Sequence, residues 1–308
     1  MSKLSIATFT NLGYLAHARN FEPVDADLSG QTIVVTGATG GLGRQASLQL
    51  ARLGARLVAV GRDPAKLEAL TSESDGVVIG IRADLSMMSD IRDLATRIID
   101  SEPRVDVLIN NVGVLLPERT ETDEMIETTL ATNLAGQFLL TNLLIPRLRE
   151  SAPSRVVMVS SGGMYAERVR PDDLGYSRGE YSGASAYART KRGQVILTEM
   201  WADRHAGSGI SFHAMHPGWA KTEGVKRSLP VFNTLMKPLL RTPAQGADTI
   251  VWLASATEPG MTNGRFWFDR KPAPTHLIES TRETLEDREL LWDNLETLTG
   301  VKPQRTAS

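Results

Sequence analysis

The chain has 308 residues, of which 41% are hydrophobic and 23% are charged, and these proportions are ordinary for a globular protein with a full core. Its net charge of −2 gives no electrostatic reason to expect nucleic acid or an anionic membrane as a partner, and the absence of cysteine excludes disulfides, thiolate catalysis and cysteine metal sites. The sequence shows no signal-peptide pattern and no apolar run long enough to span a bilayer, so we expect a cytoplasmic protein.

Residues 1–29 precede the first predicted strand and form an N-terminal extension. Apolar residues recur there at roughly helical spacing, at Leu4, Phe9, Leu12, Leu15 and Ala16. This spacing predicts a short amphipathic helix that packs on the protein, because it carries few of the basic residues that interfacial membrane helices add. A membrane anchor, an oligomer contact and a pocket lid are the alternatives.

Strand and helix patterns alternate over residues 30–270. Strands are predicted at 32–35, 56–60, 76–81, 105–109, 155–160, 210–215 and 264–268. Helices are predicted at 44–53, 64–70, 91–99, 123–149, 184–205 and 244–254. Such alternation implies right-handed crossovers and a mostly parallel sheet covered on both faces. We therefore expect one α/β domain with a doubly wound (Rossmann) sheet.

Residues 271–308 are predicted to form a C-terminal helix and tail. Leucines at helical spacing mark the apolar side of this helix, at Leu285, Leu291, Leu295 and Leu298. The acidic residues of the segment are expected on its solvated face, at Glu283, Glu286, Asp287 and Glu289.

A glycine-rich stretch, TGATGGLG at 36–43, follows the first predicted strand and leads into a helix. In such a turn, backbone N–H groups and the helix N-terminus can face a pyrophosphate. Gly37 would permit the tight turn, Gly41 would allow close approach to the phosphates, and Gly43 would allow close packing of helix on strand. The remaining residues predicted to bind the cofactor in this turn are Thr39, Gly40 and Leu42. The spacing is a variant of the dinucleotide fingerprint, and a glycine-rich turn without a ligand is the alternative.

Tyr187 and Lys191 lie four positions apart on a predicted helix, so their side chains share one face. A cation beside a phenol lowers the phenol pKa, which suits reversible protonation of a carbonyl or alcohol oxygen. Ser161 ends the preceding predicted strand and would hydrogen-bond the same substrate oxygen. Functional groups gather at this edge of parallel sheets, which favours a catalytic role over a structural one.

Seven stretches now resemble the short-chain dehydrogenase/reductase (SDR) family, in family order: TGATGGLG (36–43), ADL (83–85), NNVG (110–113), TNLAG (132–136), VSSGG (159–163), YARTK (187–191) and HPGWAKT (216–222). The resemblance implies an NAD(P)-dependent oxidoreductase with Ser161, Tyr187 and Lys191 as its catalytic triad. It also implies that Asn133 completes a tetrad by holding a water relay behind the lysine.

The same resemblance implies the rest of a cofactor site. Asp84 would meet the adenine ring, and Leu85 belongs to the same cofactor-binding stretch. Asn110 and Gly113 would lie beside the adenosine ribose and the central sheet. Tyr187 and Lys191 would also contact the cofactor, with Lys191 on the nicotinamide ribose hydroxyls. Thr222 would bind the carboxamide after the Pro217-Gly218 turn.

One departure from the family pattern is informative. Ser161 and Tyr187 are 26 positions apart, whereas many family members have about half that separation. The insertion, roughly 164–182, resembles the retinol-dehydrogenase-like branch. Four further stretches resemble a single subfamily within that branch: SSGGMY, MHPGWAKTEGV, AQGADTIVWLA and GRFWFDRKPAPTHL.

Cofactor choice is predicted from the end of the second strand. NAD-preferring sites usually carry an acidic residue there, and this chain has Gly61 followed by Arg62. A guanidinium makes charge-assisted hydrogen bonds to a 2′-phosphate, so NADP(H) is expected in preference to NAD(H). The alternative is that Arg62 points to solvent and only begins a helix.

The predicted reaction is NADP(H)-dependent interconversion of a carbonyl and an alcohol on a largely apolar small molecule. The apolar segment 225–240 lies where the family places its substrate lid, although a helix pair packed on the core would fit as well. The rival functions are a non-catalytic module that senses NADP(H) and a sugar-nucleotide epimerase. No metal is expected, since His213 and His216 are three apart at a strand and face opposite ways. Neither nucleic acid nor a membrane is expected as a partner, and homo-oligomerisation is left open.

Overall fold

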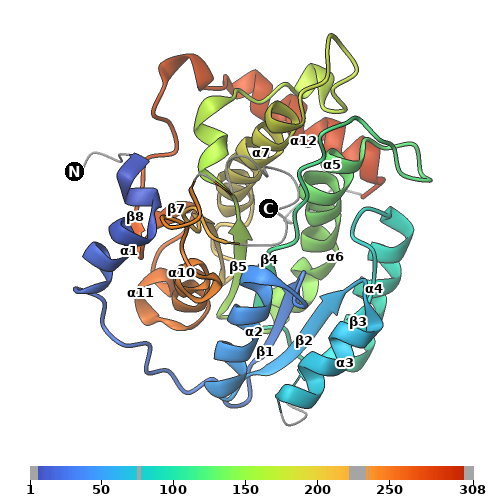
Figure 1. The fold of residues 1–308 in the computed structure, drawn as a ribbon. Coiled ribbons are helices and arrows are strands. Elements are labelled where there is room, and N and C mark those ends of the chain that lie inside the picture. The colour runs from blue at the N-terminus through green and yellow to red at the C-terminus, as the bar shows by residue number, and fades with distance from the viewer. Residues whose placement is uncertain (1–5, 75–77, 222–233, 235, 302–308) are drawn as a thin grey trace.

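The structure, a computed structural model, describes residues 6–74, 78–221, 234 and 236–301. These residues form an eight-stranded sheet in the order β3-β2-β1-β4-β5-β6-β7-β8 (Figure 1). All neighbouring strands pair in parallel except β7 and β8, which are antiparallel. The strands are β1 (Thr32–Thr36), β2 (Arg56–Gly61), β3 (Val78–Arg82), β4 (Val107–Asn110), β5 (Ser154–Val159), β6 (Ile210–His216), β7 (Arg265–Phe268) and β8 (Lys271–Pro272).

Helices connect the strands and extend the chain at both ends. The α-helices are α1 (Asn11–Ala18), α2 (Gly41–Arg52), α3 (Pro64–Glu73), α4 (Met88–Ser101), α5 (Thr128–Leu130), α6 (Gly136–Glu150), α7 (Gly183–Arg204), α10 (Pro243–Ser255), α11 (Thr257–Gly260) and α12 (Leu285–Thr299). A π-helical turn, Ala131–Ala135, joins α5 to α6. Short 3₁₀ turns are Ile6–Phe9, Gly162–Ala166, Pro171–Asp173 and Glu279–Thr281.

Both faces of the sheet are buried, which explains why its strands are almost continuously apolar. Along β1, Ile33 and Val35 enter one core cluster and Val34 enters the other, because successive side chains point to opposite faces. The first cluster packs against α2, α3 and α10, and the second against α4, α6, α7 and α12. This arrangement confirms the predicted doubly wound α/β fold.

Two predicted elements need correction. The helix expected from residue 123 begins at Thr128, because the Thr122 amide donates to the Ile126 carbonyl in a turn where Met125 has a φ of 60°. Glu127 then caps the helix by accepting hydrogen bonds from the Thr129 and Leu130 amides. The strand at 264–268 is not the last one, because β8 turns back along β7.

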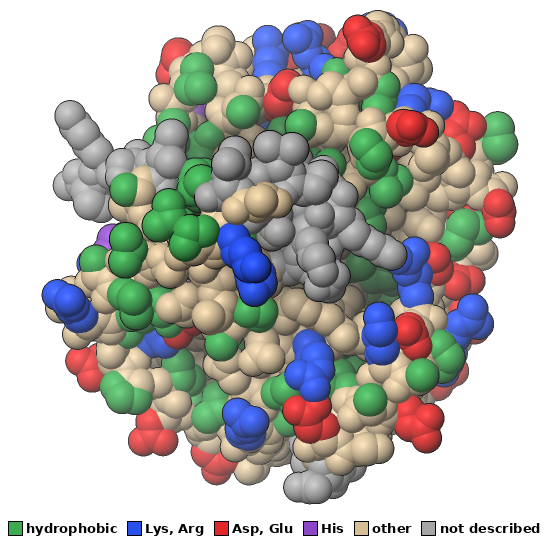
Figure 2. Space-filling model, viewed as in Figure 1, with side chains coloured by type: hydrophobic (Ala, Val, Ile, Leu, Met, Phe, Trp, Pro, Cys, Tyr) green, Lys and Arg blue, Asp and Glu red, His purple; other side chains and the backbone are tan. Residues whose placement is uncertain are grey.

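The N-terminal segment packs on the domain, as expected, but through Phe9 more than through its leucines. The Phe9 ring is buried and lies edge-on to His216 and Phe268, with ring centres 4.7 and 5.4 Å apart. Leu12 and Leu15 of α1 are 63% and 50% exposed, and hydrophobic side chains gather at this position in Figure 2. Leu4 lies outside the described residues.

At the other end of the chain, one acidic residue departs from its prediction. The Glu283 side chain is only 4% exposed, lies before α12, and pairs with His276 and Arg288. Elsewhere on the face in Figure 2, acidic and basic side chains are interspersed. Among the described helices, none is both long enough and apolar enough to cross a bilayer.

Candidate active site

Ser161, Tyr187 and Lys191 come together at the carboxyl edge of the sheet, as predicted. Ser161 follows β5, and the other two residues lie one turn apart on α7, whose first turn is capped by Ser182. Ser161 lies beside Tyr187, since a Cβ atom built at Gly163 would lie 3.7 Å from the Ser161 Oγ and 3.8 Å from the Tyr187 Cδ1. The Lys191 Nζ lies 5.4 Å from the centre of the Tyr187 ring and donates to the Val159 carbonyl at 2.9 Å. The carboxyl end of β5 and the first half of α7 therefore bring these three polar side chains together.

The electrostatics of this group differ from the expectation. Burial raises the pKa of the Tyr187 hydroxyl, and the neighbouring Ser161 acts in the opposite direction. Burial also lowers the pKa of Lys191 to about 7, so the lysine carries much less charge at neutral pH than an exposed lysine does. The predicted lowering of the Tyr187 pKa by a neighbouring cation is therefore wrong for this arrangement, because desolvation of both groups is the larger effect.

Asn133 lies in the π-helical turn, behind Lys191. Its carboxamide both donates to and accepts from the backbone of Val114, each at 2.8 Å, and it also donates to the Thr190 hydroxyl at 3.1 Å. A Cβ atom at Gly113 would lie 3.2 Å from the Lys191 Nζ and 3.5 Å from the Asn133 Oδ1. Gly113 thus lies beside both Lys191 and Asn133, and a larger residue there would crowd the lysine ammonium.

The glycine-rich turn has the geometry that its sequence predicts. Gly37 and Gly41 have φ values of 64° and 52°, in the left-handed region that glycine tolerates. A Cβ atom at Gly43 would lie 2.3 Å from the Gly37 carbonyl oxygen, so the first turn of α2 packs directly on the loop. Thr39 and Leu42 are half-buried beside it, and Gly40 is exposed, with nothing near a Cβ built there.

Asn111 holds this turn in place, a role that the sequence reasoning missed. Its Nδ2 donates to the carbonyls of Thr36 and Gly37, at 2.8 and 3.3 Å. The sequence feature that could have indicated this role is the pair of asparagines that follows a buried strand, within the NNVG stretch. Its neighbour Asn110 is fully buried and donates to Thr141 on α6 at 2.9 Å, below the edge rather than on it.

The residues predicted around the adenosine half lie at the ends of β2 and β3. Arg62 is 69% exposed, with its Nη1 3.5 Å from the Asp84 Oδ2. Asp84 also accepts hydrogen bonds from the Ser86 amide and hydroxyl, and its pKa is lowered by these bonds and by Arg62, against the raising effect of burial. Leu85 is buried in the core. A Cβ atom at Gly61 would lie 2.8 Å from the Thr39 Cγ2, so a larger side chain at this position would require Thr39 to shift.

The Pro217-Gly218 turn follows β6 at the same edge, and Gly218 has a φ of 75°. Thr222 lies outside the described residues, as do most of the apolar residues predicted for the lid at 225–240. His216 is a second residue that the sequence reasoning missed. Its Nδ1 accepts a hydrogen bond from the Gly162 amide at 2.9 Å, which ties the end of β6 to the loop that carries Ser161. Burial lowers the pKa of His216 to about 3, so it is neutral.

These residues fit a dinucleotide. The Lys191 ammonium has three N–H donors, and one of them is used by the Val159 carbonyl. The glycine-rich turn presents backbone with no side chain in the way, at the N-terminus of α2. When bound, a nicotinamide dinucleotide supplies or accepts a hydride.

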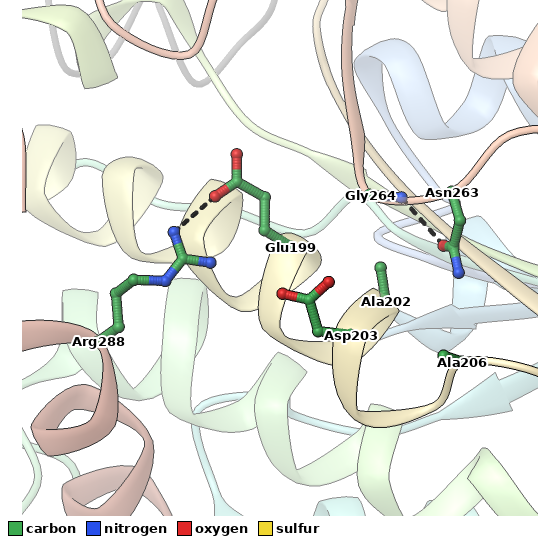
Figure 3. Close-up of a pocket in the computed structure, with 7 residues that line it drawn as sticks. All are labelled: Glu199, Ala202, Asp203, Ala206, Asn263, Gly264 and Arg288. Atoms are coloured by element: carbon green, nitrogen blue, oxygen red, sulfur yellow. Dashed lines mark hydrogen bonds and ion pairs between the residues drawn. The ribbon is translucent and has the colours of Figure 1, made fainter. Parts of the chain in front are cut away.

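A pocket of about 470 Å³ at the opposite, amino edge of the sheet contains none of these residues. It lies between the last turns of α7 and the loop before β7 (Figure 3). Two of its charged groups pair with each other, because Arg288 donates to Glu199 at 2.7 Å. His213 bonds with Trp267 and Pro259 and faces away from His216, as expected. Among the described residues, no three potential metal ligands of the His, Cys, Asp and Glu types cluster.

Comparisons with known proteins agree with this architecture. The family model described as short chain dehydrogenase matches residues 31–230. The dehydrogenase/reductase SDR family member 12 of Bos taurus is 36% identical over 300 residues, covering 94% of this chain and 93% of that protein. The human retinol dehydrogenase 13 is 34% identical, covering 91% of this chain and 88% of that protein. A Streptomyces sp. (strain C5) protein, provisionally named daunorubicin C-13 ketoreductase DnrU, is 38% identical and covers 80% and 86%.

Solved structures share the fold. The crystal structure of an uncharacterized protein from Mycobacterium paratuberculosis has a TM-score of 0.74 and 29% identity, covering 90% of this chain and 96% of that one. The RhlG/NADP active-site complex of Pseudomonas aeruginosa has a TM-score of 0.66 and 23% identity, covering 80% and 96%. The chain belongs to the short-chain dehydrogenase/reductase family, whose members are NAD(P)(H)-dependent oxidoreductases acting on CH–OH and C=O groups.

Proposed function

We propose that this enzyme uses NADP(H) to interconvert a carbonyl and an alcohol on a largely apolar small molecule, with Tyr187 as its acid and base. The observation that carries the proposal is the placement of Ser161 beside Tyr187, with the Lys191 ammonium 5.4 Å from the centre of the tyrosine ring. A hydroxyl pair at a sheet edge can bind one substrate oxygen from two directions. A lysine with unused donors beside it can hold the cofactor ribose.

Each residue has a distinct part in the proposed reaction. Ser161 donates to the substrate oxygen and orients it toward Tyr187. Tyr187 gives its proton to that oxygen in reduction and takes it back in oxidation. A raised pKa keeps Tyr187 protonated, which suits the reductive direction. Lys191 binds the ribose and supports reprotonation, and Asn133 fixes the Val114 backbone beside it.

Two observations support NADP(H) over NAD(H). Position 61 is a glycine and carries no carboxylate that would repel a 2′-phosphate, and Arg62 lies directly after it with an exposed guanidinium. The Arg62 contact with Asp84 is long, at 3.5 Å, so the guanidinium can turn to a phosphate at small cost. The NADP in the RhlG complex belongs to a protein that shares only the fold, yet it agrees with this choice.

The apolar substrate class has weaker support. The names of two relatives refer to retinol and daunorubicin, which are large and mostly apolar molecules. Of the predicted lid residues that the structure describes, Leu240 is buried, while Met236 is partly exposed and lines an apolar pocket together with Leu239. Burial of apolar ligand surface contributes roughly 25 cal/mol per Å², so such a site would select lipophilic carbonyls.

The test is NADPH oxidation by the purified protein across a panel of aldehydes, ketones and quinones that varies in charge and size. We expect turnover with medium-chain or ring ketones to exceed turnover with small charged ketones. NADPH binding without turnover on any member of the panel would instead favour a cofactor-sensing module. Turnover restricted to nucleotide sugars would favour an epimerase.

A further inference from the structure

Arg241 is a buried charge that the proposed reaction does not use. Its side chain is 1% exposed and pairs with Asp269, which is 2% exposed, through two hydrogen bonds of 2.5 and 2.9 Å. Arg241 lies two residues before α10, and Asp269 directly follows β7. A buried charge is tolerated only when it is paired and fully hydrogen-bonded, so this bidentate pair holds its two segments in a defined position.

The other donors of Arg241 reach two segments that are far apart in the sequence. The guanidinium binds three consecutive carbonyls of the N-terminal segment, with Nη2 2.8 Å from the oxygen of Thr8 and Nε 3.2 Å from those of Phe9 and Thr10. Its Nη1 also lies 3.4 Å from the Pro217 carbonyl. One side chain therefore joins residues 8–10 to the turn after β6.

The N-terminal segment also holds this turn directly. The Trp219 amide donates to the Phe9 carbonyl at 2.8 Å, and the Arg241 amide donates to the Trp219 carbonyl at 2.7 Å. A Cβ atom at Gly218 would lie 2.2 Å from the Arg241 Nε, so the backbone of the turn packs against the guanidinium. Residues 217–219 are thus clamped between the N-terminal segment and Arg241. In Figure 1 the segment lies beside β7 and β8, at the edge of the sheet.

We infer that residues 8–10, together with the Arg241–Asp269 pair, position the Pro217–Trp219 turn for the nicotinamide half of the cofactor. The inference rests on the proposed function and on the family resemblance, which implies that this turn lies at the nicotinamide half. These are positioning residues, because they act through the turn. The adenosine half is held elsewhere, by the glycine-rich turn and Arg62, so the two halves of the cofactor can be tested separately.

The experiment compares two probes, NADPH and 2′-phospho-ADP-ribose, which lacks the nicotinamide. Arg241→Lys keeps a positive charge opposite Asp269 but removes the planar guanidinium, whose N–H groups bind the carbonyls of Thr8, Phe9 and Thr10. We expect NADPH to bind about tenfold more weakly to this variant, which is the effect of about one misplaced hydrogen bond, and the affinity for 2′-phospho-ADP-ribose to stay within about twofold. A purely structural role would weaken both probes alike.

Arg270→Lys is the matched control. Arg270 pairs with Asp248 and also binds the N-terminal segment, at the Glu22 carbonyl, but none of its hydrogen bonds or ion pairs with the described residues reaches the turn. Both affinities should be unchanged in this variant.

A second variant covers the case in which Arg241→Lys does not fold. Phe9→Leu keeps an apolar side chain but removes the edge-on contact with His216. It should weaken NADPH about threefold and leave 2′-phospho-ADP-ribose unaffected. Equal effects on the two probes, or no effect on either, would overturn the inference while the cofactor assignment stood. A wild-type protein that binds neither probe would overturn the proposed function, and the inference with it.

Discussion

At the amino edge of the sheet, Asp106 accepts hydrogen bonds from the Thr32 amide and from Arg104, each at 2.8 Å, and Arg155 donates to the carbonyls of Leu253 and Ala256. At the carboxyl edge, the Lys191 ammonium has one such partner at 2.9 Å. The His216 Nε2 is buried there and has none among the described residues. The amino-edge bonds of Asp106 and Arg155 tie strands to neighbouring backbone, whereas Lys191 keeps two N–H donors without a partner among the described residues.

This difference identifies the functional edge better than cavity shape does. The pocket in Figure 3 is well formed, but Arg288 and Glu199 in its wall are paired with each other, and none of the predicted site residues line it. The carboxyl edge is marked instead by the buried Lys191, whose unused donors are costly to bury unless a ligand completes them. Substitutions at the two edges should therefore have different consequences.

Tyr187→Phe should have the largest effect. It removes the proton and keeps the ring, so turnover should fall about 10²–10⁴-fold, while the NADPH dissociation constant changes less than about twofold. Steady-state kinetics and a fluorescence titration measure the two quantities. Tyr181→Phe is the control, because that hydroxyl bonds to Glu127 and Thr129 away from Ser161, and it should leave turnover nearly unchanged. Near wild-type turnover in Tyr187→Phe would contradict the assignment.

Arg62→Ala should weaken NADPH binding by roughly 1.5–3 kcal/mol, the range for hydrogen bonds to charged groups. NADH lacks the 2′-phosphate, so its affinity should hardly change. Titration of both cofactors against both proteins measures the difference. An NADH dissociation constant equal to or below that of NADPH in the wild type would refute the proposed preference.

Asp106→Asn tests the amino edge, as the two preceding substitutions test the carboxyl edge. It removes the charge that binds Arg104 and the Thr32 amide, so the free energy of unfolding should fall by about 2 kcal/mol. Turnover should stay within about twofold, because no group at the site contacts Asp106. Urea denaturation and kinetics on the same preparation separate the two effects. A large loss of turnover at full stability would show that the two edges are coupled.

The features that the sequence predicted correctly depend on local pattern. The alternation of strands and helices follows from periodicity, and the convergence of Ser161, Tyr187 and Lys191 follows from a four-residue helical spacing plus the edge rule for parallel sheets. The start of the helix at Thr128 was missed because residues 123–127 form a turn that only its hydrogen bonds and the positive φ of Met125 define.

Other features depend on contacts between distant segments. Arg241 and Asp269 are each unremarkable in the sequence, and they meet only when α10 and β7 pack beside the N-terminal segment. Glu283 was placed on a solvated face because its spacing is helical, yet the helix begins at Leu285 and Glu283 pairs with His276 and Arg288. The pKa directions at Tyr187 and Lys191 depend on burial, which a sequence pattern does not give.

The smallest effect concerns the desolvated lysine itself. Because the pKa of Lys191 is about 7 in the folded chain and that of an exposed lysine is 10.5, the unfolded chain binds more protons at this position between those pH values. The free energy of unfolding should then rise with pH in this window, and the gain is lost as pH falls toward 7. Denaturation of the wild type and of Lys191→Met without cofactor, at pH 7.5 and 8.5, isolates the contribution, since all other groups titrate in both proteins. The wild type should gain roughly 1 kcal/mol relative to the variant over that interval. Equal pH dependence in the two proteins would mean that the ammonium is solvated, and that the carboxyl edge does not hold its bonding capacity in reserve.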